Sequence, residues 1–439
     1  MHVTDSASSV LRRFAPMIYG PTVLFSLGEG ALIPLIPVAA SQLGGDVAAA
    51  ALVTSFLVVG QLLGNLPAGW AVGRFGERVT MALGSGIAVV GGVGALVAPN
   101  LVVLSAAIFL IGFCAAVFAL ARHSFMATRV PLSFRARALS LLGGSFRLGV
   151  FIGPFVTAAL IGIFGAEQAA VWFYLACLAA TALLVLFGPD PETQARAADA
   201  RAAAERTAER DAVRDAEESE DTGEPVTGSI PTRERQGVFR TMWRHREVLL
   251  RLGVAGASLS AVRSARQAIL PLWGVSLGLD AQTIALVVGI SGSIDFALFY
   301  ASGQVMDRFG RLWAALPAMI LMGCGFLALS FTHDLASASM WYAMFAAVLG
   351  VGNGLSSGIL LTLGADVAPR PDPAPFLGSW RTLTDAGGAV APLIVTGITA
   401  ISSLAVGTGA MGVIGLVGAL AFVRWVPRFV PRRSGSSSG

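Results

Sequence analysis

Lysine is absent from the 439 residues of this chain, so all 30 of its basic residues are arginine. A Walker-type phosphate loop and a Schiff-base enzyme both need a lysine amine, and its absence excludes both. Charge of either sign is also scarce, because Asp, Glu, Lys and Arg make up 13% of the sequence, against about 25% in an average soluble domain. The composition is therefore atypical of a water-soluble protein.

Cysteine and histidine are too few and too scattered to build a metal or redox site. The three cysteines lie in separate apolar runs, where they are expected to pack as small core side chains, and the four histidines have no partner at ligand spacing. We therefore predict no disulfide, no metal, no cofactor and no enzymatic activity. These residues are Cys114, Cys177, Cys324, His2, His123, His245 and His333.

Apolar residues are what the chain has in excess. They make up 55% of the sequence, and the mean hydropathy is +0.73. A soluble core cannot hide this much apolar surface, so we expect the lipid bilayer to surround the chain. The net charge of +4 could indicate nucleic acid. However, the arginines follow the ends of apolar runs instead of forming a basic patch with aromatics, so no nucleic-acid partner is predicted.

Twelve apolar runs reach the length of about 20 residues that a membrane-spanning helix needs. The first run is too long for a cleaved signal peptide and contains Glu29, so we expect it to be a span. The predicted spans are 17–40, 48–72, 79–98, 101–121, 138–163, 169–188, 248–274, 281–305, 312–331, 336–361, 376–399 and 404–425.

Arginine occurs in the loops on one side of the predicted membrane and is missing from the loops on the other. The arginine-free loops, near 41–47, 99–100, 164–168, 275–280, 332–335 and 400–403, contain Asp46, Glu167, Asp280 and Asp334. We call these two sides the arginine end and the acidic end. The positive-inside rule predicts that the arginine end is cytoplasmic, with both termini on that side of the plasma membrane.

The two halves of the chain carry similar segments in the same order, at offsets of 237, 234 and 238 residues. This pattern predicts a duplicated six-helix unit. The matching segments are GEGALIPLIP (28–37) with ARQAILPLWG (265–274), AGWAVGRFGERV (68–79) with SGQVMDRFGRLW (302–313), and RLGVFIGP (147–154) with DAGGAVAP (385–392).

The repeat divides the chain into a first bundle at 1–188 and a second bundle at 247–427, with a tail at 428–439. Between the bundles, residues 189–246 are rich in alanine and charge and then become acidic with Gly and Pro. This composition indicates a solvated, partly helical cytoplasmic tether. A regulatory or partner-binding role for it is the alternative.

The sequence resembles the major facilitator superfamily of secondary transporters over the whole chain, apart from the linker and the tail. The family has the motif Gly-x-x-x-Asp-Arg-x-Gly-Arg between helices 2 and 3 and between helices 8 and 9. The second copy matches it fully, and the first departs from it at Gly73 and Glu77. The matching residues are Gly303, Asp307, Arg308, Gly310 and Arg311 in the second copy, and Gly69, Arg74, Gly76 and Arg78 in the first.

The resemblance implies an all-α integral membrane protein of twelve helices in two pseudo-symmetric six-helix bundles. In family terms the motif is a latch that holds one conformation closed, and the alternative is a polar turn whose arginines fix topology. Asp307 can accept hydrogen bonds at the positive start of a neighbouring helix. Because Gly73 cannot, we expect Asp307→Asn to shift the conformational equilibrium more than any substitution at Gly73.

A second family signature concerns transport direction. The helix-5 motif Gly-x-x-x-Gly-Pro of antiporters is present as Gly149, Gly153 and Pro154, whereas the arginine expected early in helix 4 is missing. The resemblance thus implies export, with the proton gradient as its energy source.

Seven ionisable residues fall inside the predicted spans, where a charge facing lipid costs about 2.5–3.5 kcal/mol. They must therefore pair or face water. They occur on helices 1, 5, 7, 8 and 11, which the superfamily places around a central cavity. The residues are Glu29, Arg147, Arg263, Arg266, Asp295, Arg381 and Asp385.

Spacing suggests partners for some of these charges. Arg381 and Asp385 are four residues apart and can pair on one helix face, whereas Arg263 and its neighbour Arg266 need outside anions. Glu29 and Arg266 occupy equivalent repeat positions. We expect these two at similar depth, either as an ion pair between the halves or as opposite poles of a substrate site.

The remaining charges indicate a substrate and a coupling ion. Arg147 and Asp295 complete a network with a surplus of one positive charge, which slightly favours an anionic or zwitterionic substrate. Glu29, followed by Asp295, is the candidate proton carrier, and a permanent ion pair is the alternative for each. Polar and aromatic residues of helices 4 and 10 can line the cavity or merely pack: Phe109, Phe113, Phe118, Trp341, Tyr342, Phe345 and Asn353.

The predicted function is secondary active transport of a small organic molecule by alternating access, with proton-coupled efflux of drugs or metabolites as the first hypothesis. An importer or uniporter of a small organic anion is the second. A non-transporting receptor or scaffold is a remote third. The expected partners are the lipid bilayer and a small-molecule substrate, and the chain is expected to be a monomer.

Overall fold

The computed structural model describes residues 18–129, 132–188, 243–369 and 374–430, and they are helical almost throughout. Twelve helical segments in these ranges are long and apolar enough to cross a membrane. The predicted linker lies outside them except for residues 243–246, and so does most of the predicted tail.

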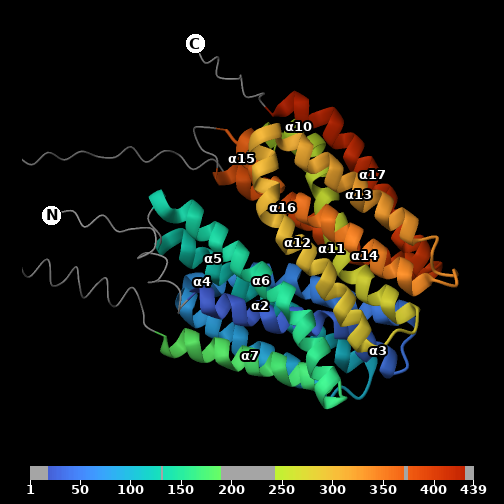
Figure 1. Cartoon of the computed structure of the whole chain (residues 1–439). Helices are drawn as coiled ribbons and strands as arrows, with labels where there is room; N and C mark the ends of the chain where they lie inside the picture. Colours follow the sequence, from blue (N-terminus) through green and yellow to red (C-terminus); the bar gives the residue numbers. More distant parts are fainter. Residues whose placement is uncertain (1–17, 130–131, 189–242, 370–373, 431–439) are drawn as a thin grey trace, which may run out of the picture.

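Six spans form the first bundle, drawn from blue to green in Figure 1. Its first span is broken by a 3₁₀ turn at Ile33–Leu35, because Pro34 and Pro37 cannot donate to an α-helical ladder. The elements are α2 Gly20–Leu32, α3 Ile36–Gln42, α4 Val47–Leu96, α5 Leu101–Arg129, α6 Leu132–Phe164 and α7 Gln168–Phe187.

The second bundle, yellow to red in Figure 1, packs beside the first. It begins with α10 and a π-helical turn at Leu249–Gly253 that leads into the seventh span. The elements are α10 Arg246–Val248, α11 Val254–Ser276, α12 Ala281–Phe309, α13 Arg311–Leu329, α14 Ala338–Leu355, α15 Ile359–Val367, α16 Ala374–Ile401 and α17 Leu404–Phe429.

The two copies of the loop motif make the same backbone turn. Gly76 (φ 79°) bends α4 between the second and third spans, and Gly310 (φ 95°) separates α12 from α13. Only glycine adopts such angles at little cost, so both halves use glycine to reverse the chain at the arginine end.

The tenth span, predicted at 336–361, is present as one candidate span at Ala338–Val367, but its helix is interrupted. Helix α14 ends at Leu355, and α15 starts after Gly358, whose φ is +78°. The Ser302 hydroxyl lies 2.7 Å from the Leu355 carbonyl oxygen and 2.9 Å from that of Ser357, so a side chain of α12 satisfies the interrupted backbone.

The bundles meet at the acidic end and diverge toward the arginine end, as Figure 1 shows for α5 and α15. At the meeting point the Ser55 and Thr396 hydroxyls lie 2.5 Å apart, across α4 and α16. A Cβ added to Gly162 of α6 would lie 2.9 Å from Gln282 of α12. The space between the bundles is therefore closed at the acidic end.

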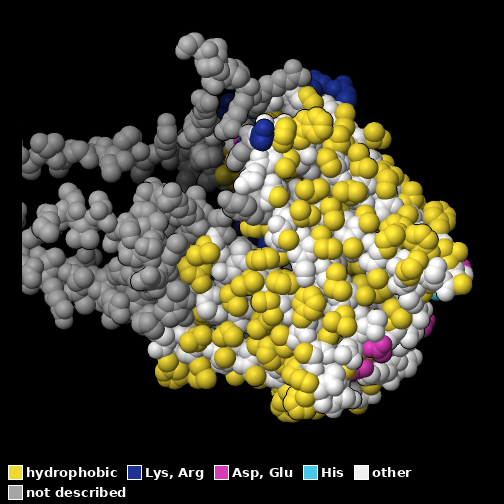
Figure 2. Space-filling model, in the orientation of Figure 1, with side chains coloured by type: hydrophobic (Ala, Val, Ile, Leu, Met, Phe, Trp, Pro, Cys, Tyr) yellow, Lys and Arg dark blue, Asp and Glu magenta, His cyan; other side chains and the backbone are white. Residues whose placement is uncertain are grey.

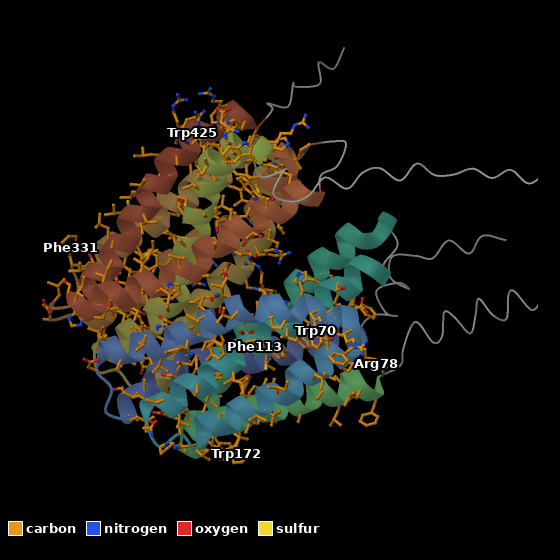
Figure 3. The ribbon with its side chains drawn as sticks, turned by 180° about the vertical axis from the view of Figure 1, so that it is seen from behind. Trp70, Arg78, Phe113, Trp172, Phe331 and Trp425 are labelled. Carbon is orange, nitrogen blue, oxygen red and sulfur yellow. The ribbon has the colours of Figure 1, made fainter. Side chains whose placement is uncertain are left out.

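Apolar side chains cover much of the face of both bundles that Figure 2 shows, where they are yellow. Trp70, Trp172 and Phe331 point outward in Figure 3 and are 60–75% exposed, as expected for side chains that meet lipid. Cys114 and Cys177 are buried as predicted. The prediction was wrong for Cys324, which is exposed on α13 because that part of the helix faces away from the core.

Candidate functional site

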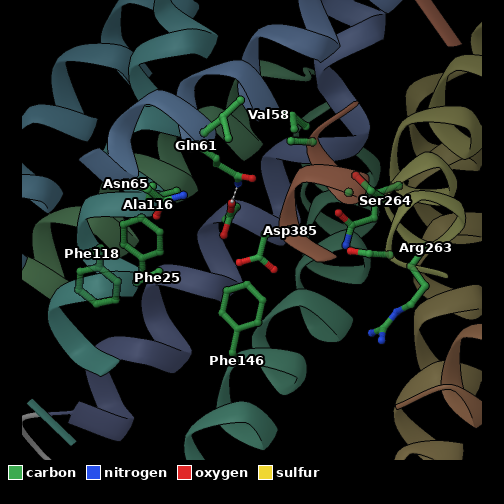
Figure 4. A pocket seen from close by; sticks show the side chains of 18 of the residues that line it. Phe25, Val58, Gln61, Asn65, Ala116, Phe118, Phe146, Arg263, Ser264 and Asp385 are labelled. Atoms are coloured by element: carbon green, nitrogen blue, oxygen red, sulfur yellow. Dashed lines mark hydrogen bonds between the residues drawn. The ribbon is translucent and has the colours of Figure 1, made fainter. Parts of the chain in front are cut away.

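Two adjoining cavities, of about 410 and 430 Å³, lie between the bundles. Both are lined by Arg122, Phe146, Arg263 and Gln267, so they form one central space with two lobes. Figure 4 shows one lobe, with residues of both bundles around it. Dark blue arginine atoms are visible in the recess between the bundles in Figure 2.

Asp295 of α12 is the centre of a charge network in the second bundle. Its carboxylate accepts hydrogen bonds from Asn353 Nδ2 at 2.6 Å and Arg147 Nη1 at 3.1 Å, and it lies 3.6 Å from Arg266 Nη2. Arg266 also donates to the Ser291 hydroxyl at 2.6 Å, and Arg263 Nε donates to Asn353 Oδ1 at 3.0 Å. Four of the predicted site residues therefore share one network.

Arg147 belongs to α6, so its bond to Asp295 joins the two bundles. The Arg147 guanidinium also lies over the ring of Phe299, 4.7 Å from its centroid. Beside this pair, Phe151 and Phe296 stack across the same interface with centroids 5.3 Å apart. The fifth span, α6, and the eighth span, α12, thus hold the bundles together at the cavity wall.

Glu29 of α2 lies on the wall of the other lobe and is 6% exposed. Its carboxylate accepts one long hydrogen bond, 3.4 Å from Gln61 Nε2 of α4, drawn as the dashed line in Figure 4. It also interacts electrostatically with Arg122. Within the described residues Glu29 and Arg266 have separate partners, so of the two predicted arrangements the direct ion pair is not formed here.

Arg122 is the functional candidate that the sequence analysis missed. It was placed in a loop after a span ending at residue 121, but α5 continues to Arg129 and the candidate span to Met126. Its side chain is 6% exposed, and its guanidinium lies over Phe146 at 4.7 Å. Phe125 and Met126 are buried on the next turn, and this continuing apolar pattern was the signal available.

Arg381 and Asp385 pair along α16 at 3.5 Å, as their spacing predicts. Both side chains are more than half exposed, and they face opposite lobes of the central space. Ion pairs this accessible to water contribute little stability. Arg381 instead adds positive charge near Arg122, with which it interacts electrostatically.

Polar side chains and aromatic rings complete the lobe that contains Glu29. Of the aromatics predicted on helices 4 and 10, Phe118 lines it, stacked on Phe25 at 4.3 Å. Tyr342 is buried and donates to the Leu270 carbonyl oxygen instead. Further lining residues that the sequence analysis did not single out are Gln61, Asn65, Ser260, Ser264 and Gln267.

Comparison with known proteins identifies the family of this chain. A family model of the Major Facilitator Superfamily matches residues 22–392. The chain belongs to this superfamily. It is accordingly a multi-pass membrane protein and a secondary transporter of small molecules, and not an enzyme.

Relatives of known sequence or structure agree with the superfamily assignment. The chain is 27% identical over 172 residues to "Putative metabolite transport protein YncC" of Bacillus subtilis (strain 168), a match that covers 38% of this chain and 35% of that protein. It therefore spans about one third of this relative's length.

Solved structures confirm the predicted all-α membrane fold. A POT family transporter in complex with a thioalcohol-conjugated peptide has a TM-score of 0.70 at 11% identity, covering 94% of this chain and 96% of that one. A D-xylose–proton symporter has a TM-score of 0.66 at 14% identity, covering 96% and 98%. At these identities the likeness shows the fold alone.

The superfamily's helix-5 signature has a packing role in this chain. A Cβ added to Gly149 would lie 2.6 Å from the Leu27 backbone nitrogen, and one added to Gly153 would lie 2.5 Å from that of Ala31. The two glycines therefore let α6 approach α2 closely. Pro154 follows within α6.

The last arginine of each loop has different partners, and Arg78 lies one residue beyond the position that corresponds to Arg311. Arg78 donates to the carbonyl oxygens of Val185, Leu186 and Gly188 at 2.7–2.8 Å, which caps the C-terminal end of α7. Arg311 instead pairs with Asp366 of α15 at 2.8 Å.

The other residues of the loop motif make few contacts with the rest of the described structure. Gly69 and Gly303 have open space around them, apart from one leucine methyl 4.0 Å from a Cβ at Gly69. Arg308 lies over the ring of Phe309. The side chain of Asp307 lies outside the described residues, so the latch remains a prediction.

Proposed function

We propose that this superfamily member is a proton-coupled transporter of a small organic molecule and that Glu29 carries the proton. The carrying observation is the position of Glu29, buried at the cavity wall with one long hydrogen bond. Whether a carboxyl group is protonated or ionised depends on its exposure to water and on the charges beside it. A change in cavity hydration can therefore tip the balance during alternating access.

Asp295 is the second candidate proton carrier, but its contacts support a structural role. It faces two arginines and an amide, all of which bind the ionised carboxylate. Protonation would weaken all three contacts, including the bond between the bundles. We therefore assign Asp295 to the network that holds the cavity wall.

Efflux by proton antiport is the direction that we propose, because the antiporter signature of helix 5 is complete. Its glycines also let helix 5, which is α6, pack closely against α2, the helix that carries Glu29. We further propose that the arginine end faces the cytoplasm, with both termini there, that the plasma membrane is the location, and that the chain acts as a monomer.

Import or uniport of a small organic anion is the second candidate function. The observation that favours it is the excess of arginine in the central space, where Arg122, Arg147, Arg263, Arg266 and Arg381 line the two lobes. A receptor or scaffold role is not supported, because the chain belongs to a transporter superfamily.

The test is proton movement in proteoliposomes that contain the full chain and a pH-sensitive dye. Neutral drugs, organic amines and organic carboxylates are added singly to find a solute that moves protons. Antiport gives proton flow opposite to the solute, symport gives flow in the same direction, and uniport gives solute movement without proton flow. We expect antiport, and proton-free transport would contradict Glu29 as carrier.

Two variants locate the proton site. Glu29→Gln keeps the shape of the side chain and an acceptor for Gln61, so we expect solute binding to persist and proton movement to cease. Glu167→Gln is the matched control, because Glu167 is also a partly buried carboxyl but lies at the acidic end, outside the two lobes. Unchanged proton movement in Glu29→Gln would overturn the assignment.

A further inference from the structure

The central space has more positive than negative side chains. Five arginines line its two lobes, against the three carboxylates Glu29, Asp295 and Asp385. Sequence spacing predicted a surplus of one positive charge, and Arg122 raises it to two. Uncompensated charge of one sign along the walls of a cleft favours a ligand of the opposite sign.

Ion pairing within the site leaves two of these arginines without a carboxylate. Asp295 accepts from Arg147 and lies beside Arg266, and Asp385 pairs with Arg381. In the part of the chain that the structure describes, Arg122 and Arg263 have no carboxylate within ion-pair distance. They come from opposite bundles, α5 and α11, and both line both lobes.

Arg122 is the stronger indication of a ligand. Its side chain is 6% exposed, yet its Nε and Nη1 atoms have no hydrogen-bond partner among the described residues. A buried guanidinium with two unused donors is costly, because the donors have lost water and gained no acceptor. An anionic ligand would supply the acceptor oxygens that these donors lack.

The surroundings of Arg122 indicate what else the ligand carries. Phe146 lies under the guanidinium, and the stacked rings of Phe25 and Phe118 form a wall of the same lobe. The lobe volume of about 410 Å³ is near the small end of the range for organic-ligand pockets. The pocket therefore fits a small molecule with an apolar body.

We infer that the central site binds an organic carboxylate, with the carboxylate held by Arg122 and Arg263 and the apolar body against Phe25, Phe118 and Phe146. Arg263 lines this space (Figure 4), and its Nε donates to Asn353 Oδ1 at 3.0 Å. A carboxylate between the two arginines would also join the bundles electrostatically. The inference rests on the proposal that this cavity is the transport site.

The experiment measures the thermal stability of the purified full chain in detergent with matched probe pairs. The probes are benzoate, 4-phenylbutyrate and octanoate, each beside its primary amide, with inorganic phosphate as an anion without an apolar body. We expect at least one carboxylate to raise the Tm with saturation, and its amide and phosphate to have no such effect. If no carboxylate exceeds its amide, or if phosphate is equally effective, the inference is wrong.

Variants then test the two arginines. Arg122→Gln and Arg263→Gln should each weaken binding of the effective carboxylate by about 10–100-fold, the effect of losing a hydrogen bond to a charged group. Arg424→Gln, at the exposed end of α17, should leave binding unchanged. Unaltered binding in both cavity variants would overturn the inference.

The Tm without any probe separates a ligand-binding role from a structural one. Arg122→Gln removes unused buried donors, so its Tm should equal or exceed that of the unmodified chain. Arg266→Gln breaks existing bonds to Ser291 and Asp295, so its Tm should fall. A fall in Arg122→Gln as large as in Arg266→Gln would mean that Arg122 is structural, which contradicts the inference.

The two proposals fail separately. Carboxylate binding that depends on Arg122, without Glu29-dependent proton movement, would remove the coupling proposal and keep the ligand class. Glu29-dependent proton movement with a neutral or cationic solute, together with equal binding of acids and amides, would keep the coupling proposal and remove the ligand class.

Discussion

The two bundles place a polar pair at corresponding positions but give it different chemistry. In the first bundle Glu29 of α2 accepts one long bond from Gln61 of α4. In the second, Arg266 of α11 lies beside Asp295 of α12. The partners correspond in the repeat, because Glu29 and Arg266 are 237 residues apart and Gln61 and Asp295 are 234 residues apart.

Asp295 and Glu29 differ in how many partners hold the side chain. Asp295 has three cationic or amide neighbours, so its side chain is held by several contacts. Glu29 has an amide and a more distant arginine, and its neighbour Arg122 has unused donors. The polar pair therefore lies at the same place in both repeats. The number of partners distinguishes the pair that holds the cavity wall, Arg266 with Asp295, from the pair Glu29 with Gln61.

The largest expected effect compares Asp295→Asn with Gln61→Leu. The first leaves two arginines without their carboxylate, and losing one partner of a mostly buried ion pair costs up to about 3–5 kcal/mol, since Asp295 is 15% exposed and Arg266 is 9% exposed. The second removes one long hydrogen bond, worth about 0.5–1.5 kcal/mol. Thermal unfolding of both variants in detergent measures the contrast. Equal losses would show that the two bundles do not differ as described.

The next effect tests what the repeats have in common. A Cβ added to Gly149 would lie 2.6 Å from the Leu27 nitrogen, and one added to Gly387 would lie 2.2 Å from the Ala257 carbonyl oxygen. Gly149→Ala and Gly387→Ala should each cost about 1–3 kcal/mol, because both overpack a helix contact. Gly143→Ala is the control, since no atom lies within 4 Å of that Cβ. Its Tm should not fall.

A smaller effect compares the two loop arginines. Arg78→Gln removes three bonds to backbone carbonyls and should cost about 2 kcal/mol. Arg311→Gln removes a partly exposed ion pair and should cost about 1 kcal/mol or less. Tm values of the two variants give the ranking. A larger loss for Arg311→Gln would indicate that the second loop carries more of the stability.

The smallest effect concerns Glu167 at the acidic end. Burial raises the pKa of its carboxyl, and the nearby Asp280 of the other bundle adds to this, against the bond from Gln42. A raised pKa means that the group favours the folded state at low pH and that this advantage is lost as the pH rises through the raised pKa.

Glu167→Gln should therefore raise the Tm by about 1 °C at pH 7 and leave it unchanged at pH 4. The amide oxygen can still accept the hydrogen bond from Gln42, so the geometry is kept. Tm measured at both pH values checks this. A lower Tm at pH 7 would show that the carboxylate stabilises the contact between the bundles.

Much of the cavity wall was predictable because membrane burial is so costly for charge. Glu29, Arg147, Arg263, Arg266 and Asp295 were found as ionised residues inside apolar runs, and all five line the central space. The pairing of Arg381 with Asp385 followed from helical spacing. The pairing of Arg147 with Asp295 did not, because 148 residues and two bundles separate them.

The sequence alone determined that this chain is a twelve-span membrane protein with two related halves, because apolar run length and repeated motifs are local properties. Only the tertiary structure decided that α5 runs past residue 121 and buries Arg122 beside the cavity. It also decided which carboxylate meets which arginine. Such choices depend on distances between helices that are far apart in the chain, and no local pattern encodes them.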